Sequence, residues 1–177
     1  YTDYVEHVAV IKKNEIIKDV SYQQINGQLK DIKFNTVIKK GTPRFKKKIE
    51  ANVFSMVQGA SGNNNYFHWL FDIVPRLLIL DKILSLKKID YFYLPEAKIW
   101  QLETLSIFDI TEKDIINSNK YRHIECKNLY ATSHPWYFKG QVLQEAKNLP
   151  EWIVIELFNK FIKFKKKFEC NDRIFID

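Results

Sequence analysis

Four polar side chains recur at helical spacing within the apolar segment 65–84: Asn65, His68, Asp72 and Arg76. At about 100° per residue they fall within an arc of about 80°. Apolar residues occupy the remaining arc: Phe67, Leu70, Phe71, Val74, Leu77 and Leu78. A helix that buries most of its circumference must satisfy the polar groups it carries, so this polar stripe is predicted to face an internal network or a water-filled cleft.

The chemistry that the stripe could perform centres on His68 and Asp72, which lie four residues apart. At that spacing a carboxylate can contact an imidazole, orient it and stabilise its protonated form, as in other pairs of a general base and its orienting group. The alternative is a purely structural pair within the core. Pro75 removes one hydrogen bond of the helix, so we expect a kink near Phe71, which separates Arg76 from the regular turns that carry His68.

Length and composition limit the classes of protein to which this chain can belong. With 177 residues and 46% hydrophobic side chains, the chain can bury the core of one domain of ordinary size. The longest apolar run, residues 73–80, is far shorter than the ~20 residues that cross a bilayer. Cys126 and Cys170 form no CxxC pair, so we expect neither a disulfide framework nor a zinc site. The first residue is Tyr1 and the last residues are typical of a strand, so we expect a piece of a longer protein.

The formal net charge of +7 is concentrated in two lysine clusters. The first cluster comprises Lys39, Lys40, Arg44, Lys46, Lys47 and Lys48. The second cluster comprises Lys160, Lys163, Lys165, Lys166 and Lys167. Such clusters suit anionic lipid or an anionic sugar polymer, or they form a solvated face. No zinc finger, RNP-type segment or KH-type loop accompanies them, so we expect no nucleic-acid partner. The loop 59–65 carries only Gly59 and Gly62, which is not a dinucleotide fingerprint, and we expect no cofactor.

Two regions of the sequence differ in their pattern of apolar and polar residues. Residues 1–48 alternate short apolar and polar runs with turn residues, which predicts a small β-rich appendage. Residues 49–177 alternate strands and helices, which predicts an α/β, Rossmann-like, mostly parallel sheet. Strands are predicted at 52–57, 91–94, 123–126, 129–131 and 173–176. Helices are predicted at 65–84, 98–108 and 150–165. Thr111 and Asp114 resemble a capping box, which predicts one more short helix. Ligands of such sheets bind at the carboxyl ends of the strands, where the loop 59–65 would bring the start of the polar stripe.

The run NYFHWLFDIVPRLLIL, residues 65–80, resembles the N-x-x-H-W-x-x-D-x-x-P-R-L signature of glycosyltransferase family 61, whose bacterial members are often described as capsular polysaccharide biosynthesis proteins. Further segments resemble the family in order: YLP at 93–95, Q-x-E-T-L at 101–105, NLY at 128–130 and RIFID at 173–177. The resemblance covers roughly residues 50–177. It implies the N-terminal, acceptor-side domain of a GT-B-like enzyme with two Rossmann-like domains, and a fragment that is inactive alone.

The resemblance also implies a function: transfer of a sugar from a nucleotide-sugar donor to a glycan acceptor in surface polysaccharide synthesis of the capsular or lipopolysaccharide type. We expect transfer with inversion of the anomeric centre. We also expect transfer without a metal, because the chain has no DxD triplet. Such an enzyme would be cytoplasmic or peripheral at the inner membrane, with the lysine clusters contacting lipid weakly. The competing hypothesis is a noncatalytic α/β domain that binds carbohydrate or a partner through the same stripe.

Within the transferase hypothesis, His68 is the favoured base because its ordinary pKa matches the task, and Asp72 is the alternative base. Asn65 is predicted to hold sugar hydroxyls. Trp69 either stacks on a sugar ring or belongs to the core. Arg76 either binds an acidic sugar or phosphate, or forms a salt bridge within the domain.

Overall fold

The computed structural model describes residues 2–3, 7–25, 28–57, 65–136 and 145–164. Its centre is a four-stranded parallel sheet in the order β10-β7-β8-β9. The strands are β7 (Lys47–Ser55), β8 (Tyr91–Leu94), β9 (Ile115–Asn117) and β10 (Ile124–Tyr130). Read from β9, the sheet runs third, second, first, fourth in chain order, which matches strands 3-2-1-4 of a doubly wound sheet. The predicted α/β class with a mostly parallel sheet is confirmed, and the sheet is consistent with a Rossmann-like fold.

The two faces of this sheet are distinguished by the alternation of side chains along each strand. Phe54 and Phe92 are register partners on β7 and β8, and their rings meet edge to face with centroids 6.4 Å apart. Both belong to the core beneath the helices. Ser55 and Tyr93, the next register pair, line a cavity on the other side of the sheet.

The polar stripe lies on one helix that contains an irregular turn. The helix comprises α2 (Tyr66–His68), a π-helical turn (Trp69–Ile73) and α3 (Val74–Ile83). The N–H of Val74 bonds to the carbonyl of Trp69, five residues back rather than four. Pro75 follows directly and has no N–H for the carbonyl of Phe71. The irregularity that Pro75 predicts near Phe71 is therefore present as a π turn, a feature that is frequent at functional sites.

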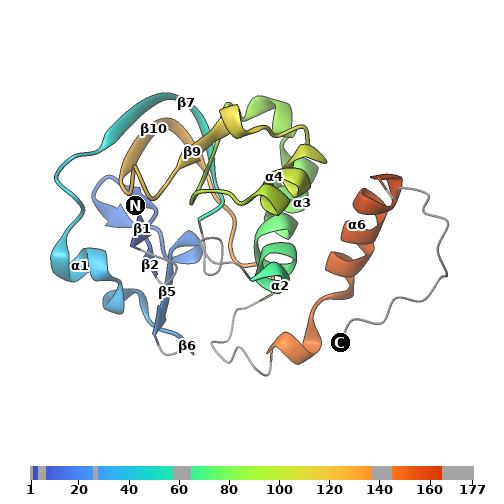
Figure 1. Cartoon of the computed structure of the whole chain (residues 1–177). Helices are drawn as coiled ribbons and strands as arrows, with labels where there is room; N and C mark the ends of the chain where they lie inside the picture. The colour runs from blue at the N-terminus through green and yellow to red at the C-terminus, as the bar shows by residue number, and fades with distance from the viewer. Residues whose placement is uncertain (1, 4–6, 26–27, 58–64, 137–144, 165–177) are drawn as a thin grey trace.

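Helices pack in layers beside the sheet. α3 and α4 (Ile99–Ser106) lie on one side of it, and α6 (Glu151–Phe161) lies on the far side of α3, as Figure 1 shows. Lys82 of α3 forms an ion pair with Glu156 of α6 at 2.5 Å. The helix predicted at 150–165 is present, and its last turn is a 3-10 turn, Ile162–Phe164. Among the described residues, no helix is long and apolar enough to cross a bilayer.

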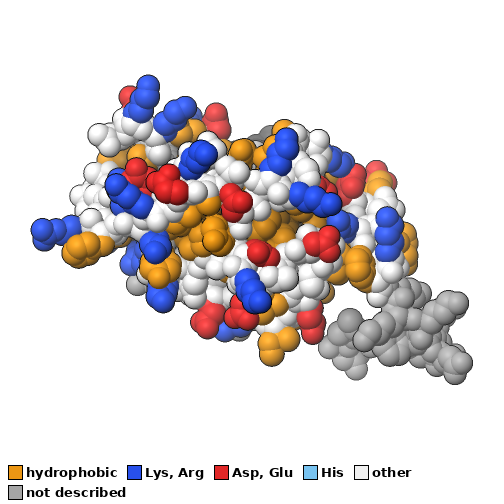
Figure 2. Space-filling view, turned by 90° about the horizontal axis from the view of Figure 1, so that it is seen from above, with side chains coloured by type: hydrophobic (Ala, Val, Ile, Leu, Met, Phe, Trp, Pro, Cys, Tyr) orange, Lys and Arg blue, Asp and Glu red, His pale blue; other side chains and the backbone are white. Residues whose placement is uncertain are grey.

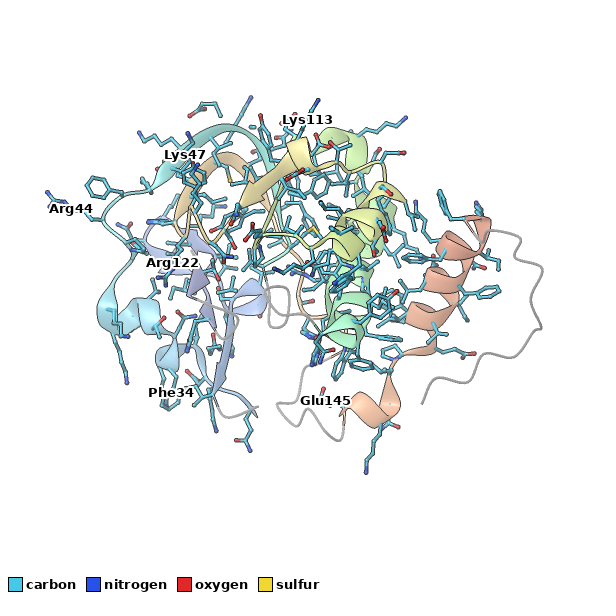
Figure 3. The ribbon with its side chains drawn as sticks, viewed as in Figure 1. Phe34, Arg44, Lys47, Lys113, Arg122 and Glu145 are labelled. Atoms are coloured by element: carbon cyan, nitrogen blue, oxygen red, sulfur yellow. The ribbon has the colours of Figure 1, made fainter. Side chains whose placement is uncertain are left out.

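The β-rich appendage covers the opposite face of the sheet. It contains an antiparallel sheet in the order β1-β2-β5-β6 and a separate hairpin of β3 and β4. Its elements are β1 (Thr2–Asp3), β2 (His7–Val8), β3 (Ile11–Lys12), β4 (Glu15–Ile16), β5 (Tyr22–Ile25), β6 (Gln28–Leu29) and a helix that was not predicted, α1 (Thr36–Lys40). A hydrogen bond of 2.9 Å from the Thr2 N–H to the Arg122 carbonyl attaches it to the segment before β10. Figure 3 shows Arg122 between the two sheets.

Several predicted elements differ in detail. The strands predicted at 123–126 and 129–131 are one strand, β10, whose pairing with β7 shifts between Cys126 and Asn128. The short helix after Thr111 is a 3-10 turn (Glu112–Asp114), and it leads into β9, which was not predicted. β7 begins at Lys47, five residues before the predicted strand. The glycines of the loop 59–65, the strand predicted at 173–176 and Cys170 lie outside the described residues.

Candidate functional site

The polar stripe meets the carboxyl ends of two neighbouring strands. β7 ends at Ser55 and β10 at Tyr130, and the segment that follows β10, residues 131–136, runs against the stripe helix. These two strands are the first and fourth in chain order, so the order of the sheet reverses between them. This reversal is the position where open α/β sheets bind ligands.

His68 and Asp72 are in direct contact. The distance from His68 Nδ1 to Asp72 Oδ2 is 2.8 Å, which confirms that the four-residue spacing lets the pair touch. The His68 side chain is 32% exposed and the Asp72 side chain only 6%, so the imidazole lies between the buried carboxylate and the surface. The hydrogen bond to Asp72 raises the pKa of His68 above its usual value near 6.5, although partial burial opposes the rise. With its Nδ1–H donated to Asp72, neutral His68 keeps Nε2 as its basic atom.

Asp72 has a second set of contacts, from the segment after β10. Trp136 donates its indole Nε1–H to Asp72 Oδ1 at 2.7 Å, and His134 Nε2 lies 3.7 Å from Oδ2. Burial is the largest influence on the Asp72 pKa and raises it, but the interactions with His134 and His68 outweigh burial and bring the pKa below its usual value. Asp72 is therefore a buried carboxylate that stays ionised at neutral pH.

His134 and Trp136 also hold each other. The Trp136 backbone N–H donates to His134 Nδ1 at 3.3 Å, and the two rings meet edge to face with centroids 5.1 Å apart. This bond makes Nδ1 the acceptor, so the ring proton of neutral His134 is on Nε2, toward Asp72. Sequence reasoning missed both residues. The available signal was an SHPW run, residues 133–136, directly after a predicted strand.

Arg76 is fully enclosed, with an exposure of 2%. Its Nε–H donates to Thr132 Oγ1 at 2.8 Å, and Nη2 donates to the carbonyl of Ser55 at 2.9 Å and to that of Thr132 at 3.3 Å. The guanidinium also lies 5.8 Å from the centre of the Phe54 ring. Burial lowers the pKa of Arg76 to about 9. The side chain thus joins the end of β7 to the segment after β10. Among the described residues its partners are internal hydrogen-bond acceptors, and the salt bridge that one alternative expected is not seen there.

Asn65 and Trp69 occupy contrasting positions. Asn65 is exposed and caps the helix, with its Oδ1 accepting the His68 backbone N–H at 3.2 Å. Its predicted contact with sugar hydroxyls stays a prediction. Trp69 has 0% exposure and packs edge-on against Trp100, with centroids 5.9 Å apart. Of the two predictions for Trp69, the structure agrees with a place in the core. A ring without an exposed face cannot stack on a sugar.

A described cavity lies in another part of the molecule. It has a volume of about 670 Å³ and lies between the β-rich appendage and the parallel sheet, on the face away from the stripe helix. Ser55, Tyr93, His123 and Cys126 are among its lining residues, and no stripe residue is. The expected crevice at the stripe is thus not this cavity. Within the described ranges, no group of three or more His, Cys, Asp or Glu side chains could hold a metal ion.

Comparison of the chain with protein-family models, curated proteins and solved structures found no match.

Proposed function

We propose that this chain is the acceptor-side domain of a GT-B-like glycosyltransferase that moves a sugar from a nucleotide-sugar donor to a glycan acceptor in surface polysaccharide synthesis. The observation that carries the proposal is the 2.8 Å contact of a partly exposed imidazole with a buried carboxylate at the reversal point of a parallel sheet. A group of this kind suits removal of a proton from an acceptor hydroxyl.

In the proposed step, the acceptor hydroxyl oxygen attacks the anomeric carbon while the bond from that carbon to the nucleotide diphosphate breaks. The hydroxyl proton passes to Nε2 of His68, and the bonding electrons leave with the diphosphate. Attack from the side opposite the leaving group inverts the anomeric centre. Asp72 stabilises the imidazolium that forms, because its carboxylate accepts the Nδ1–H.

The geometry favours His68 over Asp72 as the base. Both oxygens of Asp72 already accept hydrogen bonds, and the lowered pKa of this carboxyl makes it a weaker proton acceptor. His68 reaches the surface and has a raised pKa, which makes it the stronger base of the two. Asn65, exposed at the start of the same helix, is the proposed contact for acceptor hydroxyls.

The proposed location is the cytoplasm or the inner face of the membrane, where nucleotide sugars are available. Lysines of the first cluster are exposed on β7 and before it, and Figure 2 shows Lys and Arg side chains interspersed with Asp and Glu on one face of the molecule. One lysine of this cluster, Lys46, pairs with Glu125. A mixed surface of this kind supports at most weak contact with anionic lipid.

A second candidate is a noncatalytic carbohydrate- or partner-binding domain. The observation that favours it is that Arg76 and Trp69 are enclosed, which leaves Asn65 and His68 as the stripe residues with access to solvent. A few polar groups at a surface are enough for binding.

One experiment separates these candidates. The full-length protein is incubated with labelled UDP- and GDP-sugars on a glycan array. Both bound glycan and transferred label are measured, for the wild type and for His68→Ala. Transfer by the wild type that His68→Ala loses supports the transferase. Glycan binding without transfer in both proteins favours the binding domain. If neither binding nor transfer occurs, the transferase and the carbohydrate-binding domain are both rejected, and a domain that binds another partner is left.

A further inference from the structure

Asp72 is held from two separate parts of the chain. His68, on the same helix, contacts Oδ2, while Trp136, 64 residues later, contacts Oδ1. His134 approaches Oδ2 from the same segment as Trp136. The carboxylate is therefore fixed at both oxygens, and one of its donors is a rigid indole with 4% exposure.

We propose that Trp136 and His134 are positioning residues, which fix the plane of the Asp72 carboxylate so that Oδ2 stays on Nδ1 of His68. This inference rests on the proposed function of His68 and deepens it. Neither residue touches the reacting atoms in the proposed step, and both act through Asp72.

The physical argument begins with what the four-residue spacing alone provides. A carboxylate on a helix can rotate about its side-chain bonds and exchange a neighbouring histidine for other donors, so such a pair contributes little stability on an exposed helix. The indole N–H of Trp136 removes this freedom by occupying Oδ1 at 2.7 Å. The Trp136 ring is itself held by His134, through both the backbone N–H and the edge-to-face contact. Groups that lock a ligating or catalytic side chain in this way set its orientation and basicity.

The charged and titratable groups around Asp72 come from both sides. His68 and Arg76 lie on its own helix, and His134 lies on the packed segment. Arg76 interacts with Asp72 through its charge, with its hydrogen bonds going to Ser55 and Thr132. If Trp136 no longer holds Oδ1, the carboxylate can turn toward these other donors and leave His68.

The test is the pKa of His68, measured by NMR titration of its ring protons in the 177-residue chain. Asp72→Asn sets the scale, because it removes the carboxylate charge. We expect Trp136→Phe to lower the His68 pKa by at least half of the fall that Asp72→Asn produces. The matched control is Trp152→Phe on α6, which makes the same chemical change away from the site and is expected to leave the His68 pKa unchanged. An unchanged or raised His68 pKa in folded Trp136→Phe would overturn the proposal.

Two further measurements cover the case in which Trp136→Phe fails to fold. In the unmodified chain, the Trp136 indole N–H signal should move with the same midpoint as His68, and a signal that stays still through that titration contradicts the proposal. His134→Gln keeps an N–H donor near the position of Nε2 and should keep the His68 pKa close to that of the wild type, whereas His134→Phe should lower it. Equal values in the two variants would remove His134 from the positioning role.

The kinetic consequence distinguishes this inference from the proposed function. In the full-length protein, Trp136→Phe should shift the acidic limb of the plot of kcat/KM against pH by the amount seen by NMR, with little change in KM. If the protein shows no transfer at all, the proposed function fails while the NMR result still decides the positioning role. If transfer occurs and its pH profile does not move, positioning fails and the transferase stands.

Discussion

Asp72 and Arg76 are both buried charges on one helix, one turn apart, and their surroundings differ in kind. Asp72 contacts His68, Trp136 and His134, and one of these, His68, reaches the surface. Among the described residues, the hydrogen bonds of Arg76 go to a hydroxyl and two backbone carbonyls, all of them internal. The first arrangement can move a proton between the interior and a ligand. The second holds the end of β7 to the segment after β10, and the proposed function therefore uses the Asp72 end of the stripe.

The largest effect is expected from His68→Ala in the full-length protein. Removing the base should lower turnover by about 10² to 10⁴, the range for a positioned general base. The melting temperature should change little, because the imidazole is partly exposed. Turnover and melting temperature are measured on the same samples, with His123→Ala on the other face of the sheet as the matched control. Folded His68→Ala with normal turnover would end the catalytic interpretation of the stripe.

Arg76→Met should act on stability instead. The change leaves the Ser55 carbonyl and the Thr132 hydroxyl without their buried donor, which costs about 1–3 kcal/mol for each unsatisfied group. At a total of about 3 kcal/mol, the melting temperature falls by roughly 6–12 °C.

The control for Arg76→Met is Arg44→Met, in an exposed side chain that Figure 3 shows pointing away from the body. This change should stay within about 0.5 kcal/mol of the wild type. Thermal unfolding followed by circular dichroism measures both variants. Equal melting temperatures would mean that Arg76 does not join the strand ends.

Asp72→Asn keeps the shape of the side chain and removes its charge. Hydrogen bonds to charged groups contribute about 1.5–3 kcal/mol, so turnover should fall about 10- to 100-fold at 1.36 kcal/mol per tenfold. The steady-state rate is measured across pH together with the melting temperature. If Asp72→Asn loses stability while its folded fraction keeps normal turnover, Asp72 has a structural role like that of Arg76.

The smallest expected effect is the pH dependence of stability from the His68–Asp72 pair. Because the folded pKa of His68 is raised, its contribution is complete below the usual value near 6.5 and is lost as pH rises through the higher folded pKa. Asp72 behaves in the opposite sense, contributing above its usual pKa near 3.8 and losing that contribution as pH falls through the lower folded value.

Urea unfolding of the wild type and of His68→Ala tests this dependence. Their difference in unfolding free energy should shrink between pH 6 and pH 8, a range set by the usual histidine pKa of about 6.5 and its upward shift. A constant difference would show that His68 and Asp72 are not coupled.

Local sequence predicted the elements that carry the stripe. The 3.6-residue periodicity placed Asn65, His68 and Asp72 on one helix, and the four-residue spacing predicted their contact. The apolar run at 91–94 predicted β8 with its observed bounds, Tyr91–Leu94. The break at Pro75 was predicted because proline lacks an N–H, although its form as a π turn was not. β9, only three residues long, was missed because so short a run has no clear periodicity.

The sequence by itself determined the α/β class, the polar stripe and the pairing of His68 with Asp72, because each depends on local geometry and on the period of the apolar residues. Only the tertiary structure decided which stripe residues reach the surface and which are enclosed. The order β10-β7-β8-β9 brings residues 132–136 against the helix, where Trp136 binds Asp72 and Thr132 binds Arg76. Such contacts between distant segments depend on strand order and on the direction of each side chain, and local periodicity contains neither.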